Sequence, residues 1–243
     1  MWCKMKEINQ KIKETIKQKY GEIAINGSSC CPSCGCGENL IGYSENELAS
    51  IPSEADLGLG CGNPVALAEL KMGETVLDLG AGAGIDAFLA AKQVGPQGRV
   101  IGVDMTEEMI ERAEENARRG NFDNVEFRFG EIENLPVKDN SVDVILSNCV
   151  INLSTDKKKV FNEAFRVLRP GGRLLVSDIV IDGELTKEVR NDLNAWAECI
   201  AGALEKEAYL KTIKQAGFKK LEILGESRFG PEKVISLKVK AVK

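Results

Sequence analysis

The segment VLDLGAGAGID, residues 76–86, places the strongest constraint on the fold of this chain. Its apolar start is typical of a buried β-strand, and the following IDAFLAA is typical of a helix face. Gly80, Gly82 and Gly84 lie between the two. Glycines at a strand-to-helix turn permit positive φ and a close approach of the backbone to a ligand. The segment therefore predicts a strand–turn–helix unit with a ligand at its turn.

An acidic residue follows this turn at the distance that nucleoside-binding folds require. Asp104 lies twenty residues after Gly84 and ends the next expected strand, where a carboxylate can accept both ribose hydroxyls. The turn itself fits two patterns. Residues 82–87 fit the dinucleotide pattern G-x-G-x-x-A, whereas residues 80–84, preceded by Asp78, fit the G-x-G-x-G turn of S-adenosylmethionine (SAM) enzymes. Tight packing explains the glycines but not the acid, so we expect a nucleoside ligand.

Strands and helices alternate from Thr75 onward, which predicts βαβ units and a mostly parallel sheet. Together with an antiparallel hairpin at the tail, this gives a doubly wound α/β fold with a seven-stranded, Rossmann-like sheet. We expect strands at 75–79, 99–103, 124–129, 142–148 and 172–181, helices near 84–93, 106–119 and 155–168, and the hairpin around 225–233.

We divide the chain into three parts. Residues 1–70 form an N-terminal helix, a Cys-rich arm and a cap; residues 71–182 form the nucleoside-binding core; and residues 183–243 add helices and edge strands. The amphipathic pattern from Lys4 to about Tyr20 predicts a helix that docks on the core. Ser44 and Glu47 have the spacing of a capping box, which predicts a short helix after the arm.

The arm contains four clustered cysteines, Cys30, Cys31, Cys34 and Cys36. A closed zinc site needs four ligands, usually two separated pairs, and Cys34 and Cys36 are too close to supply the second pair easily. We therefore favour a flexible thiol-bearing arm over a zinc site. A further cysteine, Cys61, lies between glycines just before an expected helix N-terminus, where a reactive thiol is favoured.

Composition excludes several kinds of chemistry. The chain has no histidine, which excludes a histidine base or ligand, but it has eight cysteines, which favour soft-ion binding or redox chemistry in a reducing compartment. A net charge of −5 without a basic block argues against a nucleic-acid partner. Neither a signal peptide nor an apolar run of about 18 residues is present, so we expect a cytoplasmic protein without a membrane span.

Candidate ligand residues follow the expected strands, because ligands of such sheets bind at the carboxyl ends of the strands. Met105 and Ile132 are placed to cover the two faces of an adenine, although both are equally explained as core residues. Glu133 or neighbouring backbone is placed to bind the adenine amine. Asn148 and Cys149 end the fourth expected strand, where side chains face the site. Cys199 lies in an expected helix, and by itself it is explained as well by burial in the core.

Four segments resemble motifs of class I SAM-dependent methyltransferases: VLDLGAGAGID, IGVDM, SNCVINL and LRPGGRLLVSD. Three segments that contain cysteine resemble one family within this class, the arsenite methyltransferases. They are GLGCGNP with Cys61, SNCVINL with Cys149 and ECIAGAL with Cys199. The resemblance extends from about residue 20 to residue 218.

This resemblance implies that Cys61, Cys149 and Cys199 bind trivalent arsenic. It also implies that one N-terminal cysteine, Cys31 or Cys30, completes a redox set with Cys61. The implied methyl donor is SAM, the substrate is arsenite or thiol-bound As(III), and a thiol reductant such as thioredoxin or a small thiol serves turnover. We expect a monomer without a nucleic-acid or membrane partner. The positions assigned to SAM are Asp78, Gly80, Ala81, Gly82, Gly84, Asp104, Met105, Ile132, Glu133 and Asn148.

The implied chemistry agrees with the composition. Soft thiolates select soft ions, and arsenic bound by three thiolates keeps a lone pair that can attack the SAM methyl group without removal of a proton. One alternative is a SAM-dependent C- or O-methyltransferase of a small molecule, in which the three cysteines are dispensable. Another is a thiol-based metalloid-binding protein without turnover. A nicotinamide oxidoreductase is disfavoured, because SNCVINL and LRPGGRLLVSD have no role there.

Overall fold

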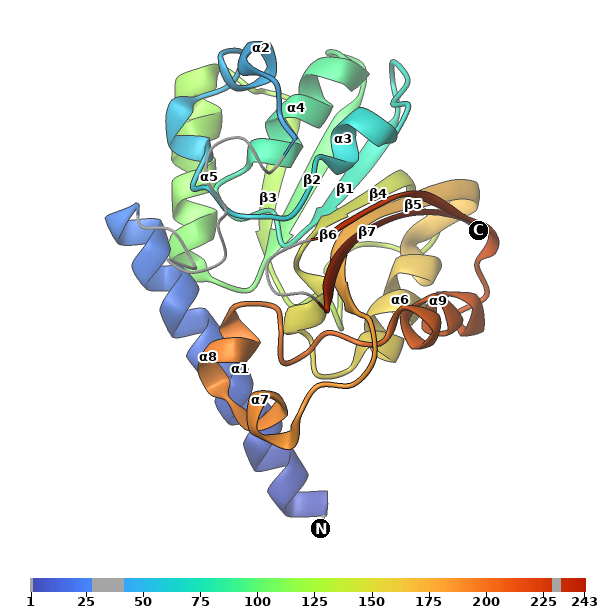
Figure 1. The fold of residues 1–243 in the computed structure, drawn as a ribbon. Coiled ribbons are helices and arrows are strands. Elements are labelled where there is room, and N and C mark those ends of the chain that lie inside the picture. The colour runs from blue at the N-terminus through green and yellow to red at the C-terminus, as the bar shows by residue number, and fades with distance from the viewer. Residues whose placement is uncertain (1, 28–41, 229–232) are drawn as a thin grey trace.

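The computed structural model describes residues 2–27, 42–228 and 233–243 of the chain. In this part, seven strands form one sheet in the order β3-β2-β1-β4-β5-β7-β6 (Figure 1). The strands from β3 to β5 in this order run parallel, whereas β7 runs antiparallel to β5 and β6. The predicted doubly wound, mostly parallel sheet is therefore confirmed. The strands are β1 (Thr75–Leu79), β2 (Arg99–Asp104), β3 (Val125–Phe129), β4 (Val142–Asn148), β5 (Leu168–Ile181), β6 (Lys219–Arg228) and β7 (Val234–Val242).

Helices cover both faces of the sheet. On one face α3, α4 and α5 pack against the strands, and on the other face α6 and α9 do so (Figure 1). The central strand β1 is buried from Val76 to Leu79 because it has helices on both sides. The helices are α1 (Trp2–Asn26), α2 (Glu45–Leu48), α3 (Pro64–Leu67), α4 (Ile85–Val94), α5 (Glu107–Gly120), α6 (Lys157–Val167), α7 (Lys187–Asn191), α8 (Leu193–Ala197) and α9 (Lys206–Gln215).

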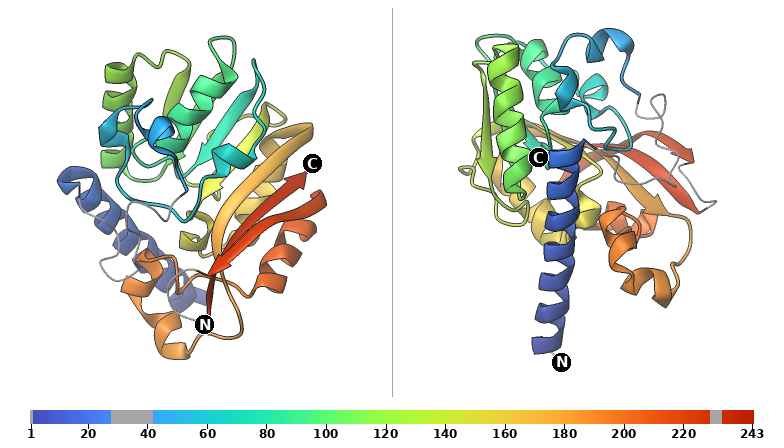
Figure 2. Two further views of the ribbon diagram at one scale, coloured as in Figure 1. Left: turned by 45° about the horizontal axis from the view of Figure 1, so that its top comes forward. Right: turned by 90° about the vertical axis from the view of Figure 1, so that its left-hand side faces the viewer.

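The N-terminal helix α1 lies outside these layers (Figure 2), and it packs against α5 and α8. Its Ile12 and Ile16 are buried, and fully burying such a side chain contributes about 1.5–3 kcal/mol. The predicted cap helix is confirmed, but it continues six residues beyond Tyr20. Glycine disfavours a helix, yet Gly21 lies inside this one, and a Cβ there would lie 3.1 Å from the Glu108 carboxyl of α5. Close packing of the two helices therefore outweighs the low helix propensity of Gly21.

One predicted helix is wrong. The segment around Cys199 forms the two short helices α7 and α8, and the second ends at Ala197. Cys199 itself lies in a turn with φ of +62°, a backbone conformation that helices do not contain. The predicted tail hairpin is confirmed, since β6 and β7 pair at the edge of the sheet.

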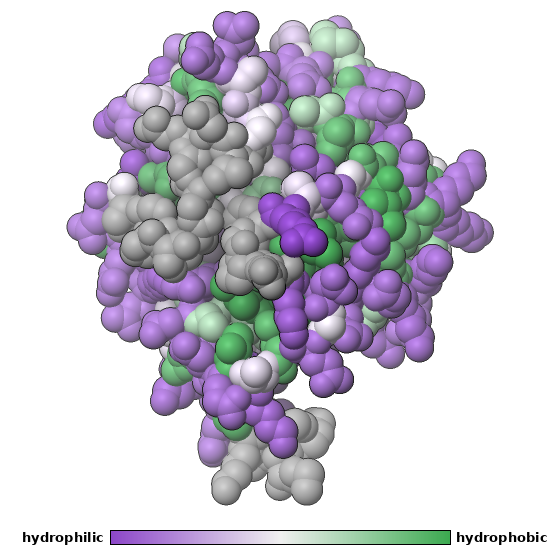
Figure 3. Space-filling view, viewed as in Figure 1, coloured by the Kyte–Doolittle hydropathy of each residue, from purple (hydrophilic) through white to green (hydrophobic). Residues whose placement is uncertain are grey.

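The visible surface is mostly hydrophilic, with small hydrophobic areas between charged side chains (Figure 3). Within the described ranges, no helix has the length and apolar character needed to cross a membrane. Among the side chains that the structure describes, the exposed large apolar ones are scattered over α1 and the loops and strands: Ile8, Ile25, Met72, Phe129 and Ile223.

Candidate active site

A pocket opens at the carboxyl ends of β1, β2 and β4 and is covered by α1. It encloses about 1020 Å³, part of which is open to solvent. From α1, Lys13, Ile16 and Tyr20 line it. Residues assigned to SAM that also line it are Asp78, Gly80, Ala81, Gly82, Asp104, Met105, Ile132, Glu133 and Asn148.

The glycine turn after β1 forms the floor of this pocket. The N–H groups of Gly80 and Ala81 both donate to the Val103 carbonyl, at 2.8 and 3.0 Å, which fixes the turn to β2. Gly80 has φ of +65°, and a Cβ there would lie 2.3 Å from a methyl group of Val150, so only glycine fits. Gly84 lies behind the turn, where an added Cβ would meet Phe88 instead of the pocket.

Asp104 is held in place and keeps acceptor capacity for a ligand. Its Oδ2 accepts a hydrogen bond from the Gly82 N–H at 3.0 Å, and its Oδ1 accepts one from the Thr106 N–H at 2.9 Å. A carboxylate offers about four lone-pair sites. Asp104 therefore lies at the pocket as a carboxylate acceptor that the hydroxyls of a ribose can approach.

Two further acids, Asp78 and Asp86, line the pocket. Asp78 is buried, and its Oδ2 has no hydrogen-bond partner. Burial, followed by the charges of Asp86 and Asp104, raises the pKa of Asp78 well above its ordinary value. A cationic ligand relieves such an arrangement, because an opposite charge favours ionised carboxylates. SAM carries a sulfonium and an ammonium group, so these residues fit it.

The far side of the pocket is fixed by ion pairs to α1. Lys13 Nζ lies 2.8 Å from a Glu131 carboxylate oxygen and 3.2 Å from one of Glu133. Glu133 also accepts a hydrogen bond from the Ser154 hydroxyl at 2.8 Å. These contacts hold the segment that carries Ile132 against the pocket, and they connect it to the covering helix.

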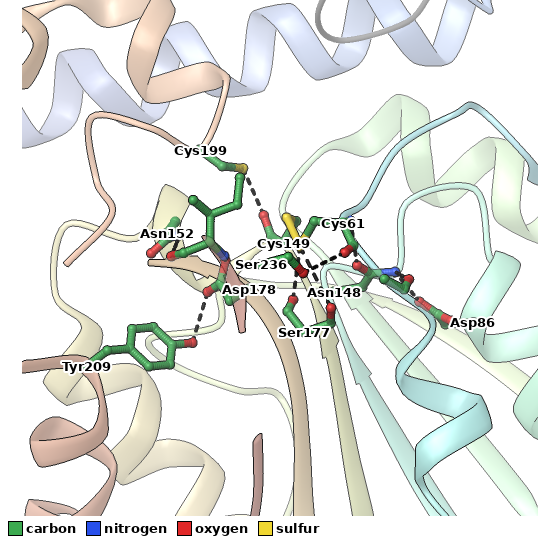
Figure 4. The surroundings of a disulfide bond; sticks show 12 residues. Cys61, Asp86, Asn148, Cys149, Asn152, Ser177, Asp178, Cys199, Tyr209 and Ser236 are labelled. Atoms are coloured by element: carbon green, nitrogen blue, oxygen red, sulfur yellow. Dashed lines mark hydrogen bonds between the residues drawn. A yellow bond between two sulfur atoms is a disulfide. The ribbon is translucent and has the colours of Figure 1, made fainter. Parts of the chain in front are cut away.

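Three cysteines meet beside the pocket (Figure 4). Cys61 and Cys149 form a disulfide with a Cα–Cα distance of 5.8 Å, and the Cys199 Sγ donates to the Cys149 carbonyl oxygen at 2.9 Å. Cys149 itself lines the pocket. The structure thus brings together the three cysteines to which the sequence analysis assigned arsenic, from segments far apart in the chain.

Cys61 is bonded to Cys149 in the structure. Its expected redox partners, Cys31 and Cys30, lie outside the described residues, so this part of the sequence analysis stays a prediction. Glycines on both sides of Cys61 favour a mobile loop, yet Cys61 is only 3% exposed. Its N–H donates to Asn148 Oδ1 at 3.0 Å, and its carbonyl accepts from the Ser236 hydroxyl at 2.9 Å, so its backbone is held on both sides.

The sequence analysis missed two residues near this pair. Tyr43 and Asp86 both contact the Asn148 side chain. Asp86 had a signal, since it is an acidic residue in the first turn of the helix that follows the glycine turn. Tyr43 is a single aromatic residue in a loop, and no pattern in the sequence marks it.

The fold and the pocket at its strand ends define a class I SAM-dependent methyltransferase. Residues 70–217 match the model of a family described as "Methyltransferase domain".

Similarity to known proteins places the chain in a particular family within this class. The chain is 45% identical over 230 residues to an arsenite methyltransferase of Halobacterium salinarum, and the matched region covers 88% of this chain and 59% of that protein. It is 34% identical over 220 residues to the human arsenite methyltransferase, covering 85% and 58%. A crystal structure of CrArsM, an arsenic(III) S-adenosylmethionine methyltransferase from Chlamydomonas reinhardtii, superposes with a TM-score of 0.71 at 36% identity, covering 81% of this chain and 71% of that one.

This chain therefore belongs to the arsenite methyltransferase family. It spans a little under three fifths of the length of the Halobacterium and human relatives.

Proposed function

We propose that the protein transfers methyl groups from SAM to trivalent arsenic held by cysteine thiolates. The observation that carries this proposal is the position of Cys149, which lines the nucleoside pocket and contacts both Cys61 and Cys199. A small-molecule methyltransferase of the same fold gives no reason for three sulfurs at this place.

The reaction asks the protein mainly to position its substrate. When bound, SAM supplies an electrophilic methyl group on a sulfonium. Cys61, Cys149 and Cys199 would hold As(III) so that its lone pair faces that methyl carbon, about 3–3.5 Å away before reaction. The arsenic–carbon bond would form with the lone pair as the carbon–sulfonium bond breaks, and the bonding pair of the broken bond would stay on sulfur. No proton moves, so the absence of histidine is no obstacle.

The proposed reaction needs electrons at two steps. The Cys61–Cys149 disulfide needs two electrons before both sulfurs can bind arsenic, and methylation formally oxidises arsenic by two electrons. We therefore include a thiol reductant in the proposal, such as thioredoxin or a small thiol, acting by thiol–disulfide exchange. The four clustered cysteines of the arm, Cys30, Cys31, Cys34 and Cys36, are proposed to relay these electrons. We further propose that the protein works in the cytoplasm as a monomer.

The direct test is incubation of the protein with SAM, arsenite and a thiol, followed by separation and mass spectrometry of methylated arsenic. Cys149→Ser and Cys199→Ser should abolish the product, because a harder oxygen ligand holds arsenic poorly, while SAM binding persists. Cys3→Ser is the matched control and should remain active. Full activity in either site variant would contradict the proposal, and so would arsenite binding by the reduced wild type without any methylated product.

A further inference from the structure

The side chain of Asn148 binds the backbone of the Cys61 loop directly. Its Oδ1 accepts from the Cys61 N–H at 3.0 Å, and its Nδ2 donates to the Gly62 carbonyl at 2.7 Å. Asn148 also directly precedes Cys149. One amide therefore connects the segment of one thiol to the residue beside the other, by contacts that do not depend on the disulfide.

The orientation of this amide is set by Asp86 and Tyr43. The second hydrogen on Asn148 Nδ2 is shared between Asp86 Oδ2 at 3.1 Å and the Tyr43 hydroxyl oxygen at 3.0 Å, while that hydroxyl donates to Asp86 Oδ1 at 2.7 Å. An ionised carboxylate only accepts hydrogen bonds, so Asp86 requires the NH₂ end of the amide to face it. The oxygen of the amide consequently faces the Cys61 N–H. We call Asn148, Asp86 and Tyr43 the Asn148 cluster.

The glycines on either side of Cys61 make this contact possible. Gly60 has φ of +110°, and a Cβ there would lie 2.9 Å from Asn148 Nδ2. A Cβ at Gly62 would lie 2.1 Å from the Ser177 hydroxyl oxygen. The backbone around Cys61 thus fits between the Asn148 amide on one side and β5 on the other, and it does so only without side chains at positions 60 and 62.

We propose that Asn148, oriented by Asp86 and Tyr43, is a positioning residue that keeps the Cys61 and Cys149 thiols together after the disulfide is reduced. A preformed pair of thiols binds one bridging atom with less loss of conformational freedom than two independent segments do. The proposal deepens the proposed function where it concerns arsenic and rests on it there. The positioning itself is a property of the protein alone.

The test is the thiol–disulfide equilibrium of the intact protein in glutathione buffers. The protein disulfide and two glutathione thiols give two cysteine thiols and one glutathione disulfide, so atoms and electrons balance. Mass spectrometry of alkylated peptides follows Cys61 and Cys149. In Asn148→Ala the equilibrium should shift at least tenfold towards the reduced pair, about 1.4 kcal/mol. Asn124→Ala is the matched control, since Asn124 Nδ2 donates to the Ala91 and Gly95 carbonyls elsewhere.

Tyr43→Phe is the second variant, because it removes one hydroxyl and should fold even if Asn148→Ala does not. It should shift the equilibrium in the same direction by a smaller factor. In the reduced protein without SAM, arsenite affinity should fall in the same order, from wild type through Tyr43→Phe to Asn148→Ala.

An unchanged equilibrium in the folded variants would overturn the positioning role, whatever happens to methylation. A shifted equilibrium in a protein whose wild type binds no arsenite would support positioning and contradict the proposed function instead. The two ideas therefore fail separately.

Discussion

Replacing Asp104 by asparagine tests the cofactor site with a change of one atom. The carboxylate already accepts hydrogen bonds from the Gly82 and Thr106 N–H groups, and its remaining lone pairs are available to the ribose. Asparagine has the same shape but no charge and only one acceptor oxygen. A hydrogen bond to a charged group contributes about 1.5–3 kcal/mol and a neutral one about 0.5–1.5 kcal/mol. Losing the charge from two ribose contacts should therefore cost about 2 kcal/mol, or about 30-fold in the SAM dissociation constant.

Isothermal titration calorimetry measures this constant for the wild type, Asp104→Asn and a control, Asp123→Asn, which changes an exposed acid away from the pocket. The control should bind SAM like the wild type. Arsenite binding by reduced Asp104→Asn should also be unchanged, since its cysteine site is intact. A change below about threefold in Asp104→Asn would refute the ribose assignment. Binding of NAD without binding of SAM would refute the whole cofactor assignment.

Three further predictions concern stability and the turn. Tyr209→Phe leaves the Asp178 carboxylate without its hydroxyl donor at 2.9 Å, so chemical denaturation should show a free energy of unfolding lower by about 1–3 kcal/mol. Gly80→Ala places a Cβ 2.3 Å from a Val150 methyl group at positive φ, and calorimetry should show loss of SAM binding. Burial raises the pKa of Asp86 from 3.8 to about 6 in the folded protein. The protonated carboxyl therefore contributes to stability below the unfolded pKa of 3.8, and this contribution is lost as the pH rises through the folded pKa of about 6. The wild type should therefore lose stability relative to Asp86→Asn between about pH 4 and pH 6 in thermal melts, and a constant difference would contradict this.

Local signals in the sequence were sufficient where neighbouring residues determine the structure. The capping box was predicted from Ser44 and Glu47, and both of its hydrogen bonds are present. Strand β1 begins and ends at the predicted residues 75 and 79, because an apolar run followed by glycines is a strong signal for a buried strand before a turn.

Contacts between distant segments could not be predicted in this way. Gly21 continues α1 because α5 passes close to it, and the sequence of α1 contains nothing about α5. The bond between Cys61 and Cys149 joins residues 88 positions apart, and eight cysteines allow many pairings. Tyr43 reaches Asn148 over 105 residues. The members of the site were therefore recognised mainly by motif, whereas their partners came from the tertiary structure.

The disulfide between Cys61 and Cys149 also affects the stability of the fold. It closes a covalent loop that contains β1, β2, β3 and β4. In the chain-entropy model, closing a loop of 88 residues lowers the entropy of the unfolded chain, which raises its free energy by about 4.6 kcal/mol at room temperature. Reduction, which frees both sulfurs for a substrate, gives up this crosslink. An arsenic atom bound to both sulfurs would close the same loop again. The bound substrate would then act as a reversible crosslink, and it would raise the melting temperature of the reduced protein.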